Sequence, residues 1–236
     1  MSESPDGTVE QADPGVTSTW FVIPLFNEAQ VIGDVVTELR RRYPLVVCVD
    51  DGSRDGSAEI AAEAGAAVVR HPFNMGQGAA LKTGIDYALR DPAMRQVVTF
   101  DADGQHQVDD AAAMIGLRGR EDVDLVLGSR FLDQRTRPGL LKRLVLRAAV
   151  RYTNLTTGVK LTDAHNGLRV IGRGACRRIT IEQNRMAHAS EIVEEIGRLR
   201  LSVREHPVHI LYTDYSKQKG QSMLNSVNIV IDMLFR

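Results

Sequence analysis

Short apolar runs that end in acidic residues constrain the fold of this chain more than any other feature. Leu45 to Asp50 (LVVCVD) is almost continuously apolar, and Gln96 to Phe100 runs directly into Asp101. Runs of this length and composition are typical of strands buried on both faces of a parallel sheet. Helical patterns separate them, so the sequence predicts an α/β fold with a Rossmann-like, mostly parallel sheet flanked by helices.

The spacing of apolar residues also predicts the remaining elements. Further strands are expected at 20–24, 67–70, 124–127 and 202–210, and helices at 29–42, 57–64, 78–90, 140–156, 187–200 and 223–235. Asp55 is the expected N-cap of the helix at 57–64, and Gly65 its C-terminal stop. Residues 163–169 (DAHNGLR) and 212–221 are expected to be polar loops.

Composition limits the class of protein and its compartment. The chain has 236 residues and a net charge of −1, so no global attraction to nucleic acid is expected. Residues 1–18 are rich in Ser, Pro, Asp and Glu, and we expect a disordered tail there, followed by a single domain over 19–236. No run of about 20 apolar residues suited to crossing a bilayer occurs. Cys48 and Cys176 indicate neither a disulfide framework nor a zinc site, and the cytoplasm is the expected compartment.

Asp101-Ala102-Asp103 follows a predicted VVTF strand. Ligands of open parallel sheets bind outside the carboxyl ends of the strands, which directs attention to this pair. Two carboxylates at i and i+2 can converge on one hard cation, Gly104 makes the necessary turn easy, and Gln105 offers a third oxygen. A lone D-x-D is more often a solvated turn, but its place after a strand favours a Mg²⁺ or Mn²⁺ site.

Two more polar segments follow predicted strands. Asp50 and Asp51 can hydrogen-bond a base or ribose, or can cap the next helix, and we favour Asp51 as the ligand contact. Residues 74–78 (NMGQG) open a helix, and their glycines permit close backbone approach to a ligand. Neither a complete Rossmann fingerprint nor a P-loop occurs, which argues against a dehydrogenase or a P-loop enzyme.

Charged side chains of the second half are weaker candidates. Arg130 follows the strand at 124–127, and a phosphate contact and a surface salt bridge are equally good interpretations. Three arginines at helical spacing share one face of the helix at 140–156: Arg143, Arg147 and Arg151. Such a stripe is more often solvated than anion-binding. His188 and Glu191 fit a packed helix start better than a metal site, while Glu191 stays a candidate general base.

Four ordered motifs between Phe21 and Arg130 resemble those of glycosyltransferase family 2. They read VIPLFNE, VDDGSRDGS, HPFNMGQGAALKTG and TFDADGQHQ. Within that family the chain looks most like the dolichol- and polyprenyl-phosphate sugar synthases. The resemblance implies a GT-A fold, with residues 19–130 as the donor half and 131–236 as the acceptor half. It also implies an inverting, metal-dependent transfer of a hexose from a UDP- or GDP-sugar.

The resemblance further implies roles for individual residues. The nucleotide would lie against Pro24, Phe26, Asn27, Glu28, Asp51, Gly76, Gln77, Asp101 and Ala102. The metal, Mg²⁺ or Mn²⁺, would be held by Asp101, Asp103 and Gln105. Catalysis would depend on Asp103, Arg130 and Glu191. The acceptor or its phosphate would meet Arg130, Arg143, Asn166 and Arg169.

The acceptor itself stays open between two chemistries. Relatives commonly read DxxSGFR where this chain reads DAHNGLR, so that Asn166 replaces a serine. A polyprenyl phosphate is the favoured acceptor, and a cell-surface glycan precursor is the alternative. A phosphate is already an anion and needs no base, whereas a sugar hydroxyl needs one, for which Glu191 is the candidate.

Other functions and partners are also considered. A sugar nucleotidyltransferase usually carries a glycine-rich loop at its first strand, which PLFNE lacks. A non-catalytic nucleotide-binding protein is the other alternative, and the intact D-x-D pair argues against it. The apolar helix at 223–235 suggests peripheral association with the inner face of a membrane, or a homodimer contact.

Overall fold

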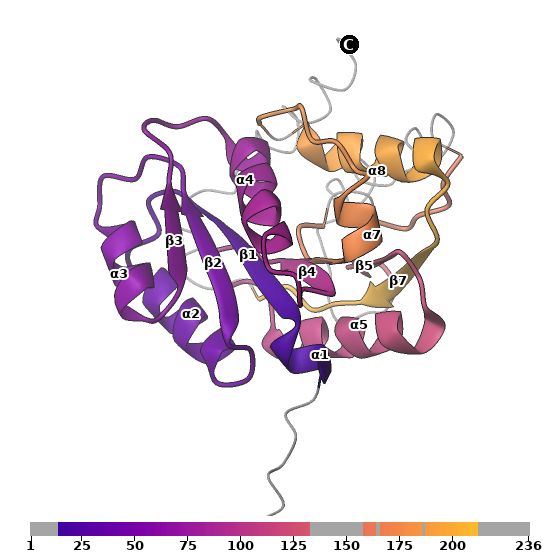
Figure 1. Ribbon diagram of the computed structural model, residues 1–236, viewed down its shortest axis with the longest axis horizontal. Helices are drawn as coiled ribbons and strands as arrows, with labels where there is room; N and C mark the ends of the chain where they lie inside the picture. Colours follow the sequence, from indigo (N-terminus) through magenta and orange to yellow (C-terminus); the bar gives the residue numbers. More distant parts are fainter. Residues whose placement is uncertain (1–13, 133–157, 164–165, 186, 212–236) are drawn as a thin grey trace, which may run out of the picture.

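Seven strands form one sheet through the centre of the part of the chain that the structure describes (Figure 1). This computed structural model describes residues 14–132, 158–163, 166–185 and 187–211. The strands are β1 (Thr19–Leu25), β2 (Leu45–Asp50), β3 (Ala67–Arg70), β4 (Gln96–Thr99), β5 (Leu125–Ser129), β6 (Arg169–Gly172) and β7 (Val203–Pro207). Their order across the sheet is β3-β2-β1-β4-β6-β5-β7.

The strand pairings are mostly parallel. β1 pairs in parallel with β2 and β4, β2 with β3, and β5 with β7. Only β6 runs the other way, antiparallel to both β4 and β5. The first residue of β6, Arg169, therefore lies at the edge of the sheet where its neighbouring strands end. This edge, called the carboxyl edge below, collects the loops that follow the six parallel strands.

Helices cover both faces of the sheet (Figure 1). One face packs against α2 (Ile32–Arg40), α3 (Ser57–Glu63) and α5 (Val108–Glu121), with the short α1 (Pro14–Thr17) beside them. The other face packs against α4 (Gln77–Leu89), α7 (Arg173–Cys176) and α8 (His188–Leu199). Alternate residues of the central strands serve the two cores: Phe21 and Ile23 face one, Val22 the other. A strand buried on both faces must be apolar throughout, which explains the near-continuous runs in the sequence.

The α/β prediction is confirmed, and the strands of the first half fall close to their expected bounds. β2 and β3 cover the predicted residues 45–50 and 67–70. The helix expected at 187–200 is α8, His188–Leu199. Cys48 lies in the core, where burial raises the pKa of its thiol to about 12.

Two elements that position the site were not expected from the sequence. α5 has two acidic residues in its first turn and two glycines further along. Its apolar face is narrow, so its apolar residues recur only weakly at the helical period. β6 has four residues and begins with a buried arginine, Arg169, which had been assigned to a polar loop. A strand of four residues has few buried positions. One charged residue among them removes the apolar pattern by which such a strand is recognised in the sequence.

Several expected boundaries are corrected by the structure. The helix predicted at 29–42 is shorter, Ile32–Arg40, and the strand predicted at 202–210 is β7, Val203–Pro207. The N-cap of α3 is Gly56, with φ of 85°, rather than Asp55. Asp55 still accepts a hydrogen bond from the backbone N of Ser57. A short helix, α1 (Pro14–Thr17), lies within the range 1–18 for which a disordered tail was expected.

Some predictions fall on residues outside the described ranges. These are the helices at 140–156 and 223–235, the loop at 212–221, and the side chains of Arg143, Arg147 and Arg151. Membrane or dimer contacts of the last helix belong to the same group. Within the described ranges, none of the helices has the length and apolar character needed to cross a membrane.

Candidate active site

Polar residues gather along the carboxyl edge as the sheet topology predicts. The register pairs Leu25 with Asp50 and Asp50 with Arg70, so the loops after β1, β2 and β3 begin at one level. Ser129 at the end of β5 is level with Pro207 at the end of β7. The D-x-D segment follows β4 between these two groups. The structure therefore brings the predicted residues after β1, β2, β4 and β5 to the same edge.

Asp101, the first carboxylate of the D-x-D pair, lies among hydrogen-bond donors. Gln77 donates to its Oδ1 at 3.2 Å, and the Nε2 atom of His106 lies 2.9 Å from its Oδ2. Burial would raise the pKa of Asp101, but the nearby His106, Arg169 and His188 hold it below its usual value. The Asp101 carboxyl is therefore ionised and ready to bind a cation at neutral pH.

Asp103, the second carboxylate, is in a less favourable environment. Burial, and then the charge of Asp101, raise the pKa of Asp103 to about 6. A hydrogen bond of 3.1 Å from the backbone N of Gln105 and the charge of His106 oppose this rise, and the like charge of Glu28 adds to it. Like charges held close together are relieved by a bound cation, and carboxylate oxygens are the ligands that Mg²⁺ and Mn²⁺ prefer. The chemistry and charge of this pair fit a divalent cation.

Protein ligands alone do not complete a metal site here. Within the described ranges no group of three or more His, Cys, Asp or Glu side chains could hold a metal ion. Gln105, the expected third oxygen ligand, is almost fully buried. The two carboxylates therefore leave most of a cation's coordination shell for a ligand.

The carboxylate of Asp51, a residue expected to contact a nucleoside, makes three contacts within the protein. Its carboxylate accepts hydrogen bonds from the backbone N of Met75 at 2.8 Å and of Gly76 at 2.7 Å. Its Oδ1 lies 2.7 Å from His71 Nδ1, and His71 Nε2 lies 3.0 Å from the hydroxyl of Thr83. With only 3% of its surface exposed, Asp51 fixes the 71–76 segment against α4. Its contacts favour a role in shaping the loop.

The loop after β1 is held by side chains of the loop after β2. Ser53 and Ser57 accept hydrogen bonds from the backbone N of Asn27 and Glu28, at 2.9 and 2.8 Å. The side chain of Asn27 in turn accepts from the backbone N of Arg54 at 3.0 Å, and Asn27 has a left-handed φ of 54°. Phe26 is left 44% exposed beside this fixed loop. An exposed aromatic ring on a rigid loop is suited to stacking on a base.

The glycines at 76 and 78 allow a close backbone approach, and the segment that approaches them in this structure is 182–185. A Cβ on Gly76 would stand 2.1 Å from the carbonyl oxygen of Asn184, and one on Gly78 would stand 2.0 Å from that of Gln183. The backbone N of Gly78 donates to the Asn184 oxygen at 2.8 Å. Residues 182–185, called the strap below, thus close the N-terminus of α4.

Glu191, the candidate general base, anchors the strap. One carboxylate oxygen accepts from the backbone N of Glu182 at 3.0 Å, and the other accepts from that of Gln183 at 2.9 Å. A general base needs a free oxygen within reach of the attacking hydroxyl. Because both oxygens of Glu191 already accept hydrogen bonds from the strap, the geometry favours a structural role.

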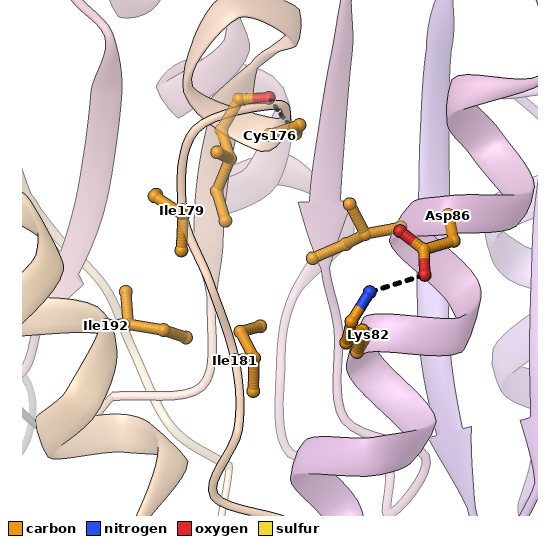
Figure 2. Close-up of a pocket in the computed structure, with 8 residues that line it drawn as sticks. Lys82, Asp86, Cys176, Ile179, Ile181 and Ile192 are labelled. Atoms are coloured by element: carbon orange, nitrogen blue, oxygen red, sulfur yellow. Dashed lines mark hydrogen bonds and ion pairs between the residues drawn. The ribbon is translucent and has the colours of Figure 1, made fainter.

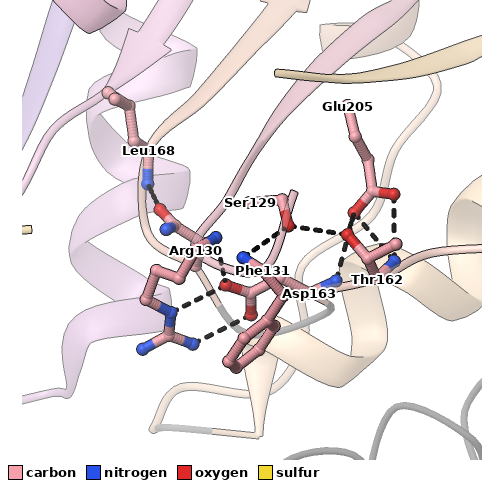
Figure 3. A network of polar contacts seen from close by, with 8 residues as sticks. Ser129, Arg130, Phe131, Thr162, Asp163, Leu168 and Glu205 are labelled. Carbon is pink, nitrogen blue, oxygen red and sulfur yellow. Dashed lines mark hydrogen bonds and ion pairs between the residues drawn. The ribbon is translucent and has the colours of Figure 1, made fainter. Parts of the chain in front are cut away.

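Arg130 forms a forked ion pair with Asp163, the first residue of the DAHNGLR segment (Figure 3). Its Nε and Nη2 donate to the two oxygens of Asp163 at 2.7 and 2.8 Å, and its backbone N donates at 3.1 Å. The Asp163 side chain is almost fully buried, whereas 18% of the Arg130 side chain is exposed. The arginine is therefore fixed in place with part of its surface facing outward.

Glu205 on β7 holds the other side of this network (Figure 3). It accepts hydrogen bonds from the backbone N of Thr162 and of Asp163, at 2.9 and 3.1 Å. The Thr162 hydroxyl lies 2.6 Å from that of Ser129, at the end of β5. Burial raises the pKa of Glu205, and the two backbone N–H groups oppose that shift. Residues 162–163 are thereby fastened to both β5 and β7.

Arg169, expected to contact the acceptor, is buried at the base of the site. Only 2% of its surface is exposed, and its Nη1 has no hydrogen-bond partner among the residues that the structure describes. Burial lowers the pKa of Arg169 to about 10, and the charges of Asp101 and Asp163 oppose that shift. The arginine therefore supplies positive charge beneath the carboxyl edge, between the D-x-D pair and the Arg130 ion pair.

A small cavity elsewhere does not suit a nucleotide. It lies between α4, α7 and α8 and is lined by Lys82, Ile85, Asp86, Ile171, Cys176, Ile179, Ile181 and Ile192 (Figure 2). Its volume of about 20 Å³ holds no more than a water molecule. Burial raises the pKa of the Cys176 thiol to about 12, so this cysteine is not a nucleophile.

Sequence reasoning missed several residues that shape the site. His71, Asp163, Gly167 and Glu205 were not singled out. Gly167 lies so close to the D-x-D pair that an added Cβ would stand 2.4 Å from Asp101 Oδ2. The sequence offers one signal for Gly167, a glycine in a polar loop that precedes a strand. That signal depends on recognising β6 as a strand, which the apolar pattern does not allow.

Comparison with known proteins agrees with this geometry. Residues 20–180 match the model of the family described as "Glycosyl transferase family 2". An uncharacterized protein of Methanocaldococcus jannaschii is 33% identical over 91% of this chain and 90% of its own length. The UDP-N-acetylglucosamine–dolichyl-phosphate N-acetylglucosaminyltransferase of Methanococcus voltae is 28% identical over 91% of this chain and 94% of its own length.

A further relative and a solved structure are also similar to this chain. The polyprenol monophosphomannose synthase of Mycolicibacterium smegmatis is 31% identical, over 69% of this chain and 64% of its own length. A crystal structure of glucosyl-3-phosphoglycerate synthase from Mycobacterium tuberculosis has a TM-score of 0.71, at 18% identity, covering 99% of this chain and 85% of the other. That similarity concerns the fold.

The chain belongs to glycosyltransferase family 2. It is a glycosyltransferase, with the sheet architecture of its structural neighbours, and the resemblance of its motifs to polyprenyl-phosphate sugar synthases is confirmed.

Proposed function

We propose that the protein transfers a sugar from a UDP- or GDP-sugar to a polyprenyl phosphate, with inversion at the anomeric carbon. The observation that carries this proposal is the arrangement of the carboxyl edge. The D-x-D pair, suited to a cation, and the fixed guanidinium of Arg130, suited to an anion, lie on opposite sides of the segment that precedes β6. A donor diphosphate and a phosphate acceptor need those two chemistries side by side.

The donor would be held by residues from the loops after β1, β3 and β4. Phe26 offers an exposed ring to the base, while Asp51 and His71 keep the 71–76 segment in place. Asp101 and Asp103, with Gln105 close by, are the residues that would hold Mg²⁺ or Mn²⁺. When bound, such a cation neutralises the charge that develops on the leaving nucleotide. The relatives named above include a transferase whose name specifies a UDP-sugar and a dolichyl phosphate.

Two observations favour a phosphate over a sugar hydroxyl as the acceptor. Each oxygen of the Glu191 carboxylate, the candidate base, accepts a backbone hydrogen bond from the strap. A phosphate monoester is already ionised and needs no base. The positive charges of Arg130 and Arg169 are also placed where an anion would approach the D-x-D pair. We place this activity at the cytoplasmic face of a membrane, where a lipid phosphate is presented to the protein.

A panel assay tests the proposal. The protein is incubated with Mn²⁺, with UDP-glucose, UDP-N-acetylglucosamine or GDP-mannose, and with either a short-chain polyprenyl phosphate or the corresponding free alcohol. We expect a glycolipid product from the phosphate and none from the alcohol, with loss of product when the metal is chelated. Transfer to the free alcohol at an equal rate would contradict the phosphate assignment.

The stereochemistry is read in the same assay. Proton NMR of the first product formed from an α-linked donor should show a β-linked sugar. An α-linked product would contradict the inverting mechanism.

A further inference from the structure

The segment that follows β7 returns to the loop that carries the D-x-D pair. Residues 208–211, called the return segment below, come directly after β7. The backbone N of Val208 still donates to β5, at 3.0 Å from the Ser129 oxygen. Three residues later, the backbone N of Leu211 donates to the Gln105 oxygen at 3.0 Å. The return segment therefore joins the last strand of the sheet to the D-x-D loop.

Two side chains at the start of α5 hold the middle of the return segment. The Asp110 carboxylate accepts a hydrogen bond of 2.7 Å from the backbone N of His209. The amide nitrogen of Gln107, the N-cap residue of α5, lies 3.2 Å from His209 Nδ1 and 3.4 Å from the His209 backbone oxygen. His209 is thus held at three of its polar atoms, and Asp110 makes the shortest of the three contacts.

The place of Asp110 in the helix does not by itself explain this contact. Asp109 and Asp110 both lie in the first turn of α5, where the helix dipole favours negative charge. Asp109 is exposed, whereas Asp110 is buried. Burying a carboxylate costs free energy unless it accepts hydrogen bonds, and Asp110 accepts one from a residue 99 positions further along the chain. The dipole accounts for the charge of both residues, and the return segment accounts for the burial of Asp110.

The contacts form a closed ring that includes the backbone of the expected cation ligands. The backbone N of Gln105 donates to Asp103 Oδ1 at 3.1 Å, and the Gln105 oxygen accepts from Leu211. The position of the Gln105 backbone therefore affects Asp103 as well as the side chain of Gln105 itself. Because Leu211 lies two residues beyond His209, a contact that fixes His209 also limits the movement of the Leu211 N–H group.

We propose that Asp110 is a positioning residue of the cation site. By holding His209, it keeps the Leu211 N–H group on the Gln105 carbonyl, and so fixes the backbone from which Asp103 and Gln105 are directed toward the cation. The inference rests on the cation site of the proposed function. It makes the affinity of that site for Mn²⁺ depend on a hydrogen bond between α5 and the return segment.

Hydrogen exchange in the metal-free protein tests the ring of contacts. Asp110→Ala removes the acceptor for His209, and Asp109→Ala is the matched control, because it removes the same charge from the same helical turn at an exposed position. The Leu211 amide should be protected in the wild type and in Asp109→Ala, and should exchange about ten times faster in Asp110→Ala. Equal exchange in all three proteins would overturn the inference.

Metal binding tests the consequence for the site. Calorimetry is carried out with Mn²⁺ in the presence of UDP or GDP. The Mn²⁺ dissociation constant should rise about tenfold in Asp110→Ala, which is the usual scale when a residue that supports a metal ligand is lost. Asp109→Ala should bind Mn²⁺ as the wild type does. An unchanged affinity in Asp110→Ala would overturn the inference, and so would an equal loss in Asp109→Ala.

A conservative variant separates the hydrogen bond from the charge. The amide oxygen of Asp110→Asn can still accept from the His209 N–H group, so this variant should bind Mn²⁺ within about threefold of the wild type. An affinity as low as that of Asp110→Ala would overturn the proposed role of the bond. At saturating Mn²⁺ the kcat of Asp110→Ala should return to near the wild-type value. A kcat that stays low at saturating Mn²⁺ would indicate a general structural defect and would also overturn the inference.

A second variant applies if Asp110→Ala does not fold. Gln107→Ala removes the other two contacts to His209, and it should raise the Mn²⁺ dissociation constant about threefold. No rise would overturn the inference. The wild type is measured first: if it binds no Mn²⁺ with either nucleotide, the proposed cation site fails, and the inference fails with it. A wild type that binds Mn²⁺, with variants that bind it equally well, refutes the role of Asp110 alone.

Discussion

The proposed donor side and the proposed acceptor side of the carboxyl edge are built by different means. On the donor side, the loops after β1, β2 and β4 each follow a strand directly, and neighbouring loops fix one another, as Ser53 and Ser57 fix Asn27 and Glu28. On the acceptor side, Arg130 is positioned by Asp163, which lies 33 residues further along the chain. The segment that carries Asp163 is fastened by Glu205, 42 residues beyond it. The donor side is local in sequence, and the acceptor side depends on distant side chains.

This difference explains which substitutions should affect which substrate. A change on the donor side should weaken nucleotide and cation binding and leave the acceptor network intact. A change in the acceptor network should cost stability as well as acceptor affinity, because its charges are buried. The experiments below test that separation in order of decreasing effect.

The largest effect is expected from Asp103→Ala. Loss of one of the two carboxylates should reduce the rate of transfer about 1,000-fold or more, since the cation that balances the leaving nucleotide is no longer held. Thermal stabilisation by Mn²⁺ with UDP or GDP should vanish in the same variant. Asp109→Ala, which removes an exposed carboxylate at the start of α5, is the control and should behave as wild type. An active, metal-stabilised Asp103→Ala would refute the cation site.

Asp163→Asn should cost the most stability. The substitution leaves Arg130 without its forked partner and reduces the charge opposite the buried Arg169, and breaking a buried ion pair typically costs about 3–5 kcal/mol. Urea denaturation should show the loss, and acceptor KM should rise while nucleotide affinity is retained. Glu59→Gln, which breaks the exposed pair with Arg70, is the control and should leave stability unchanged. An equal loss of nucleotide affinity in Asp163→Asn would contradict the separation of the two sides.

Gly78→Ala tests the strap. The new methyl group would overlap the Gln183 carbonyl, so the strap has to move, at a cost of about 1–3 kcal/mol. Gly119→Ala is the matched control, because nothing lies within 4 Å of its added Cβ and the helix gains from alanine. Thermal melts should move in opposite directions for the two variants. A Gly78→Ala protein as stable as wild type would show that the strap is not fixed against α4.

The pH dependence of the cation site follows from Asp103. The pKa of Asp103 is raised to about 6 in the folded state, above the ordinary value of 3.8. Protonation of Asp103 therefore stabilises the metal-free folded state. This contribution is complete at pH values below 3.8 and is lost as the pH rises through about 6. In metal-free buffer Asp103→Asn should therefore melt a few degrees above wild type at pH 7.5, and the gap should close by pH 4. Because protons compete with the cation, Mn²⁺ affinity measured by calorimetry should fall about tenfold per pH unit below pH 6. A gap in melting temperature that does not change with pH would refute the raised pKa.

The smallest effect is expected from Glu191→Gln. The amide can accept only one of the two backbone hydrogen bonds, so about 1 kcal/mol of stability should be lost. Transfer to a polyprenyl phosphate should stay within a few-fold of wild type, with the same pH profile. A thousand-fold loss would instead identify Glu191 as a general base and make a hydroxyl the acceptor.

The fold could be predicted from the sequence where the chain forms consecutive strand–helix units. β2 is apolar throughout because helices cover both of its faces, and it ends where polar residues reach the edge. The β5–β6–β4 arrangement could not be predicted in the same way. β6 has only four residues, begins with a buried Arg169, and gains its stability from two strands far away in sequence.

The residues of the candidate site divide in the same way, into those that directly follow a strand and those whose contacts the sequence does not indicate. The D-x-D pair and Arg130 could be placed at the edge because each directly follows a strand. The contacts of Asp51 and Glu191 could not be predicted. The sequence does not distinguish a carboxylate that binds a ligand from one that accepts backbone hydrogen bonds. Gly76 and Gly78 are a related case: a glycine marks a close approach, and the sequence does not say that the strap is the segment that approaches.

The closure of α4 by the strap has a further consequence. In many nucleotide-binding folds a diphosphate rests on the N-terminus of a helix, where N–H groups and the helix dipole meet its charge. Here the carbonyl of Asn184 takes that position, 2.8 Å from the Gly78 nitrogen. In the proposed mechanism, a donor held at the carboxyl edge would therefore lack this permanent attraction and would depend on the cation that accompanies it. Its capture and release would then follow the concentration of free divalent metal, so that the supply of that ion sets the pace of the enzyme.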